Sequence, residues 1–132
     1  MNFVSIRLIT DDIKRLVSFY EQATGLAATW YTDDFAEIAT PSCKLAFSTT
    51  RPLALFGRDI ARPAANQSVI IEFRVADVDE SHRALAGLPN SVVQEPTTMP
   101  WGNRSLLFRD PDGNLVNFFT PITPEAIARS DR

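Results

Sequence analysis

The stretch FRDPDGNLVNFFTP, residues 108–121, reads as a strand, a tight turn and a second strand. Between its apolar runs stand five residues of types that favour turns: Asp110, Pro111, Asp112, Gly113 and Asn114. Aspartate and asparagine oxygens bond to nearby backbone amides, and glycine accepts the positive φ that many turns require. The stretch therefore predicts a β-hairpin near the end of the chain.

Outward from this hairpin, one order of elements occurs twice. Each half of the chain begins with a two-faced strand, residues 3–10 and 68–75, which leads into an amphipathic helix. The first helix is expected to start near Asp12 and to end near Thr24, and the second to start at Asp77. Three short strands follow each helix, at residues 26–32, 35–40 and 43–50 and at residues 91–97, 103–109 and 115–121.

These elements predict a single domain made of two similar modules. Module 1 covers about residues 1–50 and module 2 about residues 68–121, with a connector at 51–67 and a C-terminal tail at 122–132. An offset of 65 superimposes three pairs of residues: Asp12 on Asp77, Ser5 on Ile70 and Arg7 on Glu72. Such a constant offset is what a duplicated module leaves. In each module the helix should cover the evenly apolar face of the first strand, so that the mixed face looks the other way.

Composition limits the class of protein. With 132 residues, of which 45% are hydrophobic and 22% charged, the chain suits one globular domain. It has no run of about 18 to 20 apolar residues and no signal-peptide shape, so we expect a cytoplasmic protein without a membrane partner. The net charge is −3 and the basic residues are scattered, which disfavours nucleic acid as a partner. Cys43 is the only cysteine, which excludes an internal disulfide and a CxxC metal site.

Three segments carry a resemblance to a known family: residues 9–26, 73–85 and 100–121. Together with the repeated β-α-β-β-β order, they resemble the vicinal oxygen chelate superfamily, which includes glyoxalase I, extradiol dioxygenases, fosfomycin-resistance transferases and bleomycin-resistance proteins. The resemblance implies an α+β fold of two tandem βαβββ modules, whose curled mixed sheets enclose a cleft and carry their helices on the outer faces. It also implies a homodimer.

The resemblance places the ligands of the metal-dependent relatives at Ser5, Ile70, Asn117 and, by a looser alignment, Ala46. In those relatives the first position carries histidine or glutamine, the second histidine and the third glutamate. A divalent ion needs about three to four nitrogen or oxygen donors, typically imidazole and carboxylate, and the residues here do not supply them. The only histidine, His82, falls on the second helix, where a structural role is expected. We therefore predict no metal and no cofactor.

A small-molecule ligand is expected in the cleft instead. The predicted ligand-binding residues are Ser5, Arg7, Trp30, Phe47, Ile70, Glu72, Trp101, Asn117 and Phe119. Arg7 and Glu72 leave three alternatives open: a structural ion pair, a role in which Arg7 holds a ligand oxygen while Glu72 accepts a donor or acts as a base, or simple exposure to solvent. Asn117 can both donate and accept hydrogen bonds, and the aromatic residues could stack on a planar ligand or belong to the core.

These residues are compatible with two functions. The first is a metal-independent small-molecule-binding protein of the glyoxalase/bleomycin-resistance type. The alternative is a glyoxalase- or dioxygenase-like enzyme, with an atypical metal site or with metal-free acid/base chemistry in which Glu72 is the only catalytic candidate. A purely structural role has no specific support. Whether the modules pair within one chain or across a dimer, and whether residues 51–67 form a lid, stay open.

Overall fold

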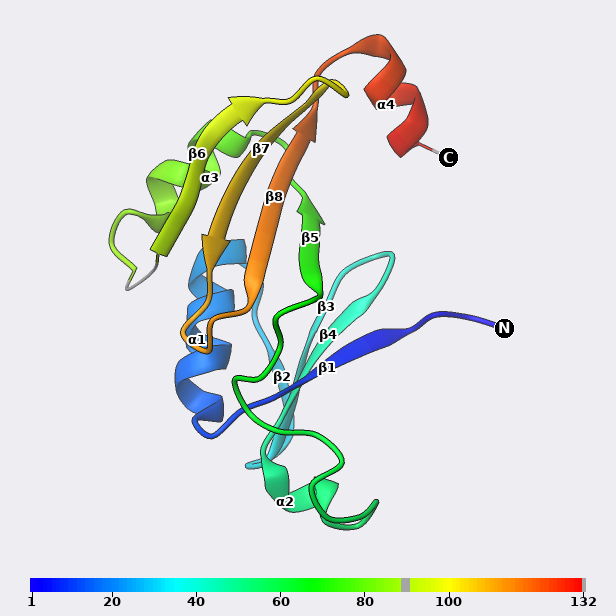
Figure 1. Cartoon of the computed structure of the whole chain (residues 1–132), viewed down its shortest axis with the longest axis vertical. Helices are drawn as coiled ribbons and strands as arrows, with labels where there is room; N and C mark the ends of the chain where they lie inside the picture. Colours follow the sequence, from blue (N-terminus) through cyan, green and yellow to red (C-terminus); the bar gives the residue numbers. More distant parts are fainter. Residues whose placement is uncertain (89–90, 132) are drawn as a thin grey trace. The chain divides into compact units, whose positions relative to one another are not determined.

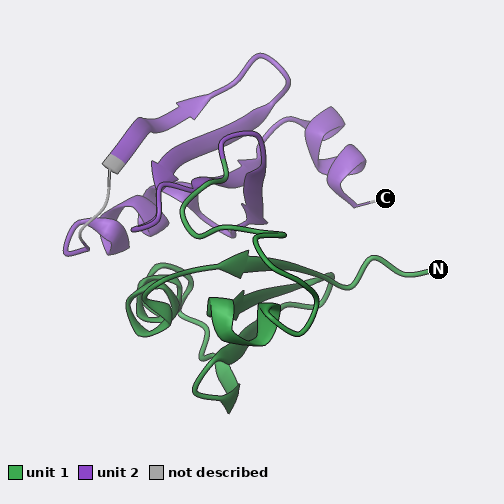
Figure 2. Cartoon of the chain, turned by 60° about the horizontal axis from the view of Figure 1, so that its bottom comes forward, with its two compact units in different colours: residues 1–66 green, residues 67–132 purple. Residues whose placement is uncertain are grey.

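The computed structural model describes residues 1–88 and 91–131. The chain forms two compact units, residues 1–66 and residues 67–132 (Figure 2). Each unit contains one four-stranded mixed sheet with a helix between its first and second strands, so the predicted α+β fold of two tandem βαβββ modules is confirmed. Among the described residues, no helix is both long and apolar enough to span a membrane.

The first unit has the strand order β1-β4-β3-β2 (Figure 1). β1 runs parallel to β4, and the other neighbours are antiparallel. Its elements are β1 (Ser5–Ile9), α1 (Ile13–Thr24), β2 (Thr29–Thr32), β3 (Phe35–Ala39), β4 (Lys44–Ser48) and the short helix α2 (Thr50–Leu53), which opens the predicted connector.

Helix α1 begins and ends where its capping residues predict. The side chain of Asp12 accepts a hydrogen bond from the Arg15 amide at 3.1 Å, and Gly25 takes a left-handed conformation with φ of 74°. The buried residues of α1 recur at helical spacing: Ile13, Leu16, Val17, Phe19, Tyr20 and Ala23. The ring of Tyr20 lies 5.4 Å from that of Phe47 in β4, so this face of the helix packs on the sheet.

The second unit repeats the arrangement, with the strand order β5-β8-β7-β6. β5 runs parallel to β8, and the other neighbours are antiparallel. Its elements are β5 (Ile70–Arg74), α3 (Val78–Leu85), β6 (Ser91–Thr98), β7 (Asn103–Arg109), β8 (Leu115–Pro121) and α4 (Pro124–Ser130). In Figure 1, α3 lies against the face of the sheet formed by β6, β7 and β8.

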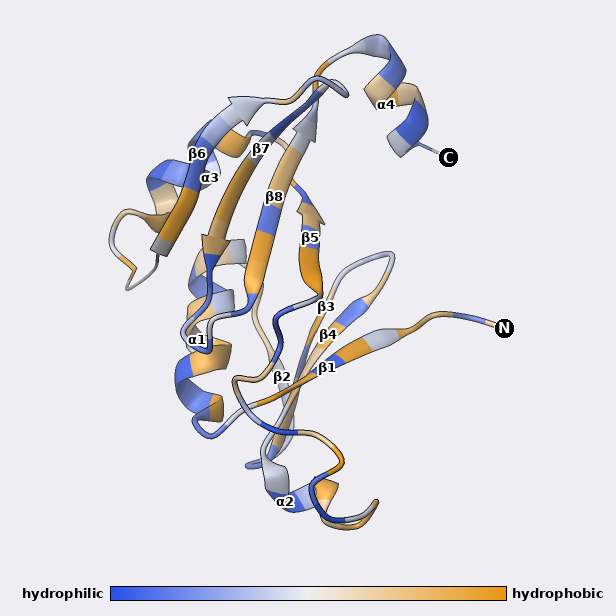
Figure 3. Ribbon diagram, viewed as in Figure 1, coloured by the Kyte–Doolittle hydropathy of each residue, from blue (hydrophilic) through white to orange (hydrophobic). Residues whose placement is uncertain are grey.

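Side chains alternate between the two faces of the second sheet. Ile71, Val116, Phe118 and Phe108 are buried on the face that α3 covers, and the rings of Phe108 and Phe118 lie 4.9 Å apart. The residues between them in β5 and β8 are more polar, which Figure 3 shows as hydrophilic bands on otherwise hydrophobic strands. The period of two is that of a sheet with one buried face.

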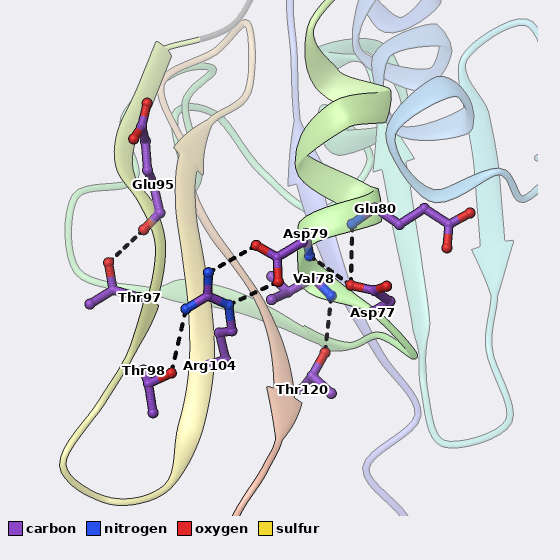
Figure 4. A network of polar contacts seen from close by, with 9 residues as sticks. All are labelled: Asp77, Val78, Asp79, Glu80, Glu95, Thr97, Thr98, Arg104 and Thr120. Atoms are coloured by element: carbon purple, nitrogen blue, oxygen red, sulfur yellow. Dashed lines mark hydrogen bonds and ion pairs between the residues drawn. The ribbon is translucent and has the colours of Figure 1, made fainter.

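The N-terminus of α3 is fixed to its sheet by polar contacts (Figure 4). Asp77 caps the helix by accepting from the amides of Asp79 and Glu80. The guanidinium of Arg104 in β7 donates to both carboxylate oxygens of Asp79, at 2.9 Å each. The amide of Val78 donates to the hydroxyl of Thr120 in β8 at 3.2 Å, so three neighbouring backbone positions of the helix start are held.

The predicted hairpin of residues 108–121 is confirmed as the antiparallel pair β7 and β8. The Asp110 carboxylate is buried in the turn, where one oxygen accepts from the amides of Asp112 and Asn114 and the other from the Asn114 side chain, at 2.7 to 2.9 Å. Gly113 has φ of 83°, the conformation for which the turn requires glycine.

Residues 122–132, predicted only as a tail, contain helix α4. The hydroxyl of Thr123 caps it by accepting from the Ala126 amide at 3.2 Å. Gly102 has φ of 94°, and a side chain at this position would collide with Thr123, so glycine allows the close approach of α4 to the turn between β6 and β7. Arg74 of β5 holds the far end of the helix through Asp131 at 2.8 Å.

Candidate ligand-binding faces

Strand register assigns the side chains of the first sheet to its two faces. Leu8 is paired with Phe47 on the face that α1 covers. Arg7 is paired with Ala46, which is paired in turn with Glu37, on the opposite face. We call this opposite face, with its strand residues at alternate positions, the open face of the first sheet.

Arg7 lies on this open face in contact with aromatic rings. Its guanidinium carbon is 5.0 Å from the ring centroid of Phe35 in β3 and 6.0 Å from that of Phe56, which follows α2. Both distances are those of cation–π contacts. Within residues 1–66, all of which the structure describes, no carboxylate lies within 4.0 Å of the Arg7 guanidinium.

A second set of polar side chains on the same face is centred on Glu37. Its carboxylate lies 3.9 Å from the ammonium group of Lys44. The carboxylate also raises the pKa of the Tyr31 hydroxyl above its usual range, first through hydrogen bonding and second through its negative charge. The ring of Tyr31 lies 5.9 Å from that of Phe35, so aromatic and charged groups are neighbours here.

The open face of the second sheet is the one opposite α3. Glu72 and Asn117 are register partners on the adjacent strands β5 and β8. The Asn117 side-chain nitrogen donates to the Glu72 carboxylate at 2.9 Å. The amide oxygen of Asn117 is buried and has no hydrogen-bond partner among the described residues. Burial without a partner leaves the desolvation of this oxygen uncompensated, whereas the Glu72 carboxylate beside it is exposed and can accept from a ligand donor.

Apolar residues accompany this pair. Ile70 and Phe119 lie on the same face of the second sheet by register, and Ile70 is exposed. The structure therefore brings together four of the predicted ligand-binding residues in the second unit: Ile70, Glu72, Asn117 and Phe119. Ser5 and Arg7 lie together on the open face of the first sheet. Which of the three alternatives for Arg7 and Glu72 holds stays open.

Three aromatic residues of the predicted set lie elsewhere. Phe47 is 0% exposed and packs on Tyr20, so it belongs to the core beneath α1 and not to an open face. Trp30 is 41% exposed, but its register partner Ala36 lies on the α1 side of the sheet. Trp101 occupies the turn between β6 and β7, as its polar surroundings predict, with 55% of its surface exposed.

The sequence reasoning missed Tyr31, Phe35 and Glu37 on the first open face. Thr29 is paired with Glu37 on the open face and Trp30 with Ala36 on the α1 side, so simple alternation places Tyr31 on the open face. The irregular pairing between Trp30 and Thr32 changes the face only of the residue that follows, Thr32. For Phe35 and Glu37 the signal was present, since they alternate with the apolar residues Ala36 and Ile38.

The single histidine lies on the helix side of the second sheet, away from its open face. His82 is on α3 and lines a hollow of about 410 Å³ with residues of the same helix, its following turn and Val92 of β6. The structural role expected for it stays a prediction.

Strand register also places Ala46, the metal-ligand position that the resemblance aligns only loosely. Arg7 is paired with Ala46 as Glu72 is paired with Asn117, so Ala46 and Asn117 are equivalent in the two units. Alanine and isoleucine offer no side-chain donor, and Ser5 and Asn117 offer only neutral oxygens. These residues do not fit a divalent metal ion. Elsewhere in the described part of the chain, no group of three or more histidine, cysteine or acidic side chains is placed to hold one.

Comparisons with known proteins agree with this fold. The profile of the Glyoxalase/Bleomycin resistance protein/Dioxygenase superfamily matches residues 2–118. The uncharacterized protein YraH of Bacillus subtilis strain 168 is 26% identical over 125 residues, which cover 90% of this chain and 98% of YraH.

Solved structures give the same result. A glyoxalase/bleomycin resistance protein/dioxygenase family enzyme from Burkholderia phytofirmans PsJN superimposes with a TM-score of 0.82 at 15% identity, covering 92% of this chain and 100% of its own. A protein of unknown function from Agrobacterium tumefaciens strain C58 superimposes with a TM-score of 0.78 at 26% identity, covering 91% and 94%. With the matched profile spanning most of its length, the chain belongs to the Glyoxalase/Bleomycin resistance protein/Dioxygenase superfamily.

Proposed function

We propose that this chain is a metal-independent small-molecule-binding protein of the glyoxalase/bleomycin-resistance type. Its ligand would contact the open faces of the sheets, which carry polar groups beside aromatic and aliphatic side chains. Sites of this composition suit small organic ligands, because apolar walls supply affinity and a few polar groups fix orientation.

The observation that carries the proposal is the pair Glu72 and Asn117. The resemblance assigns position 117 to a glutamate ligand, and here an amide stands there and donates to Glu72 at 2.9 Å. That contact directs the amide nitrogen to a protein carboxylate and leaves the amide oxygen without a partner. The exposed Glu72 carboxylate, held by the Asn117 amide, therefore offers an acceptor to a ligand donor such as an amide or hydroxyl group.

Thermal-shift screening of the purified protein against planar antibiotics and small keto acids tests the proposal. A ligand at 100 times its dissociation constant stabilises the folded state by about 2.7 kcal/mol. Replacing Asn117 by leucine, which has a similar size and no polar atoms, removes the group that holds Glu72 and should weaken this stabilisation. A Glu72→Gln variant separates the two functions, since binding should only weaken when a charged acceptor becomes a neutral one of the same size, whereas Glu72-dependent catalysis is lost.

A substitution at an exposed position away from both open faces supplies the control. Arg62→Gln changes one residue of the connector and should leave every ligand response unchanged. If no compound in a broad library stabilises the wild-type protein, the proposed function is wrong.

A homodimer is part of the proposal. β1 and β5 each end the sheet of their own unit, and edge strands carry backbone groups that need cover. Sedimentation equilibrium at micromolar concentration should give a mass of two chains of 14.7 kDa. A monomer mass at all concentrations would contradict it.

A further inference from the structure

Arg7 differs from Lys44 of the same sheet and from Arg51 of α2 because its charge is not matched within its unit. Lys44, on the same open face, lies 3.9 Å from Glu37, and Arg51 lies 3.9 Å from Asp34. Arg7 has only aromatic neighbours among the contacts of residues 1–66, a range that the structure describes completely. The open face of the first sheet therefore carries one unmatched positive charge.

The aromatic neighbours define the surroundings of that charge. The ring centroids of Phe35 and Phe56 lie 5.0 Å and 6.0 Å from the guanidinium carbon. Phe56 is 70% exposed and its neighbour Leu55 is 91% exposed, so the connector presents apolar surface beside Arg7. The ring of Tyr31 adds to this aromatic surface, because its centroid lies 5.9 Å from that of Phe35.

We infer that Arg7, Phe35 and Phe56 form a binding site for the carboxylate of a planar aromatic acid. This inference rests on the proposed function and names the ligand class for the open face of the first sheet. The guanidinium presents two parallel N–H donors that match the two oxygens of a carboxylate. The aromatic part of the ligand would lie against the rings that flank Arg7, which are apolar and exposed.

The charge on this face favours a monoanion over a phosphate group. Lys44 is matched by Glu37, so only one positive charge is available, whereas protein phosphate sites combine several cations or backbone amides. The Tyr31 hydroxyl is neutral at neutral pH, as an ordinary tyrosine is, and Glu37 raises its pKa further, so it adds no negative charge near the ligand.

Calorimetric titration with 2-naphthoate and with 2-naphthamide tests the inference, because the two probes share one ring system and differ in charge. Wild-type protein should bind the acid about 10 to 100 times more tightly than the amide, which is the effect of a charged hydrogen bond. Arg7→Gln should remove this preference by weakening only the acid, and Arg7→Lys should keep part of it. Phe56→Ala should weaken both probes, and Arg62→Gln should change neither.

The outcomes separate this inference from the proposed function. If acid and amide bind equally to the wild type, or if Arg7→Gln keeps the preference for the acid, the assignment of Arg7 is wrong while ligand binding by the protein stands. If neither probe binds but neutral members of the screening library do, the ligand class is wrong. If nothing in the library binds, the proposed function itself fails.

Discussion

Asp110 shows how one side chain can determine a turn. Its two carboxylate oxygens accept from two backbone amides and from the side-chain nitrogen of Asn114. Both side chains are nearly inaccessible, so water cannot replace these contacts at low cost. The turn fixes the register of β7 with β8 and thereby places Asn117 opposite Leu107 and beside Glu72.

Replacing Asp110 by alanine should lower the free energy of unfolding by about 1–3 kcal/mol, because buried donors lose their acceptor. Urea denaturation of the variant measures this loss. Asp33→Ala is the matched control, since Asp33 is exposed in the turn between β2 and β3. Equal stability of the two variants would contradict the role assigned to Asp110.

The residue scale also shows where sequence reasoning succeeds. The faces of Arg7, Glu72 and Asn117 follow from counting alternate positions along unbroken strands. The same counting places Phe47 on the helix side once its neighbour Ala46 is set on the open face, so the ligand-binding prediction for Phe47 ignored an available signal. Trp30 lies on the α1 side because its register partner is Ala36, and this pairing with β3 is not recorded in the sequence of β2 alone.

Among the elements, helix α3 is the one whose attachment to its sheet includes an ion pair. Its first turn is bound to β7 by the paired hydrogen bonds of Arg104 with Asp79 (Figure 4). The hydrogen bond from Arg104 is the main cause that lowers the pKa of Asp79, and the charges of Arg104, Arg83 and His82 act in the same direction, whereas desolvation opposes them. Both side chains are partly exposed, which limits the strength of the pair.

This pair predicts a pH dependence. A carboxylate with a lowered pKa in the folded state stabilises the protein above its unfolded pKa of about 3.9, and this stabilisation is lost as the pH falls through the lowered value. Asp79→Asn should therefore have a lower melting temperature than wild type at pH 7, with a difference that shrinks below about pH 4.

Thermal melts between neutral and acidic pH measure this difference, and Asp33→Asn serves as the control without such a partner. A gap between wild type and Asp79→Asn that stays constant down to the lowest pH would show that the charge of Asp79 does not hold the helix.

The predicted elements match the structure wherever periodicity and capping agree, as in α1, α3 and the β7–β8 hairpin. Helix α4 was missed although its start carries the usual signals, namely Thr123 as cap, Pro124 in the first turn and Glu125 next. Its seven residues are too few to show a helical period by themselves. The close approach allowed by Gly102 is a tertiary feature that no local pattern records.

At the scale of the whole molecule, the two units share the same pairing of strands and differ in the side chains that their open faces carry. Arg7 beside Ala46 in the first unit corresponds to Glu72 beside Asn117 in the second. The first open face thus carries an unmatched cation among aromatic rings, and the second carries a carboxylate bound by an amide. The family and the fold were readable from the repeated order of elements, whereas the ligand depends on these few side chains.

The central claim is that the protein binds its ligand without a metal ion. Calorimetric titration of the best ligand from the screen, with the protein in excess EDTA and again with added manganese, iron, nickel or zinc, tests it most directly. The dissociation constant of the ligand should be the same with EDTA and with each added metal. Binding that disappears in EDTA and returns with one of the metals would contradict it.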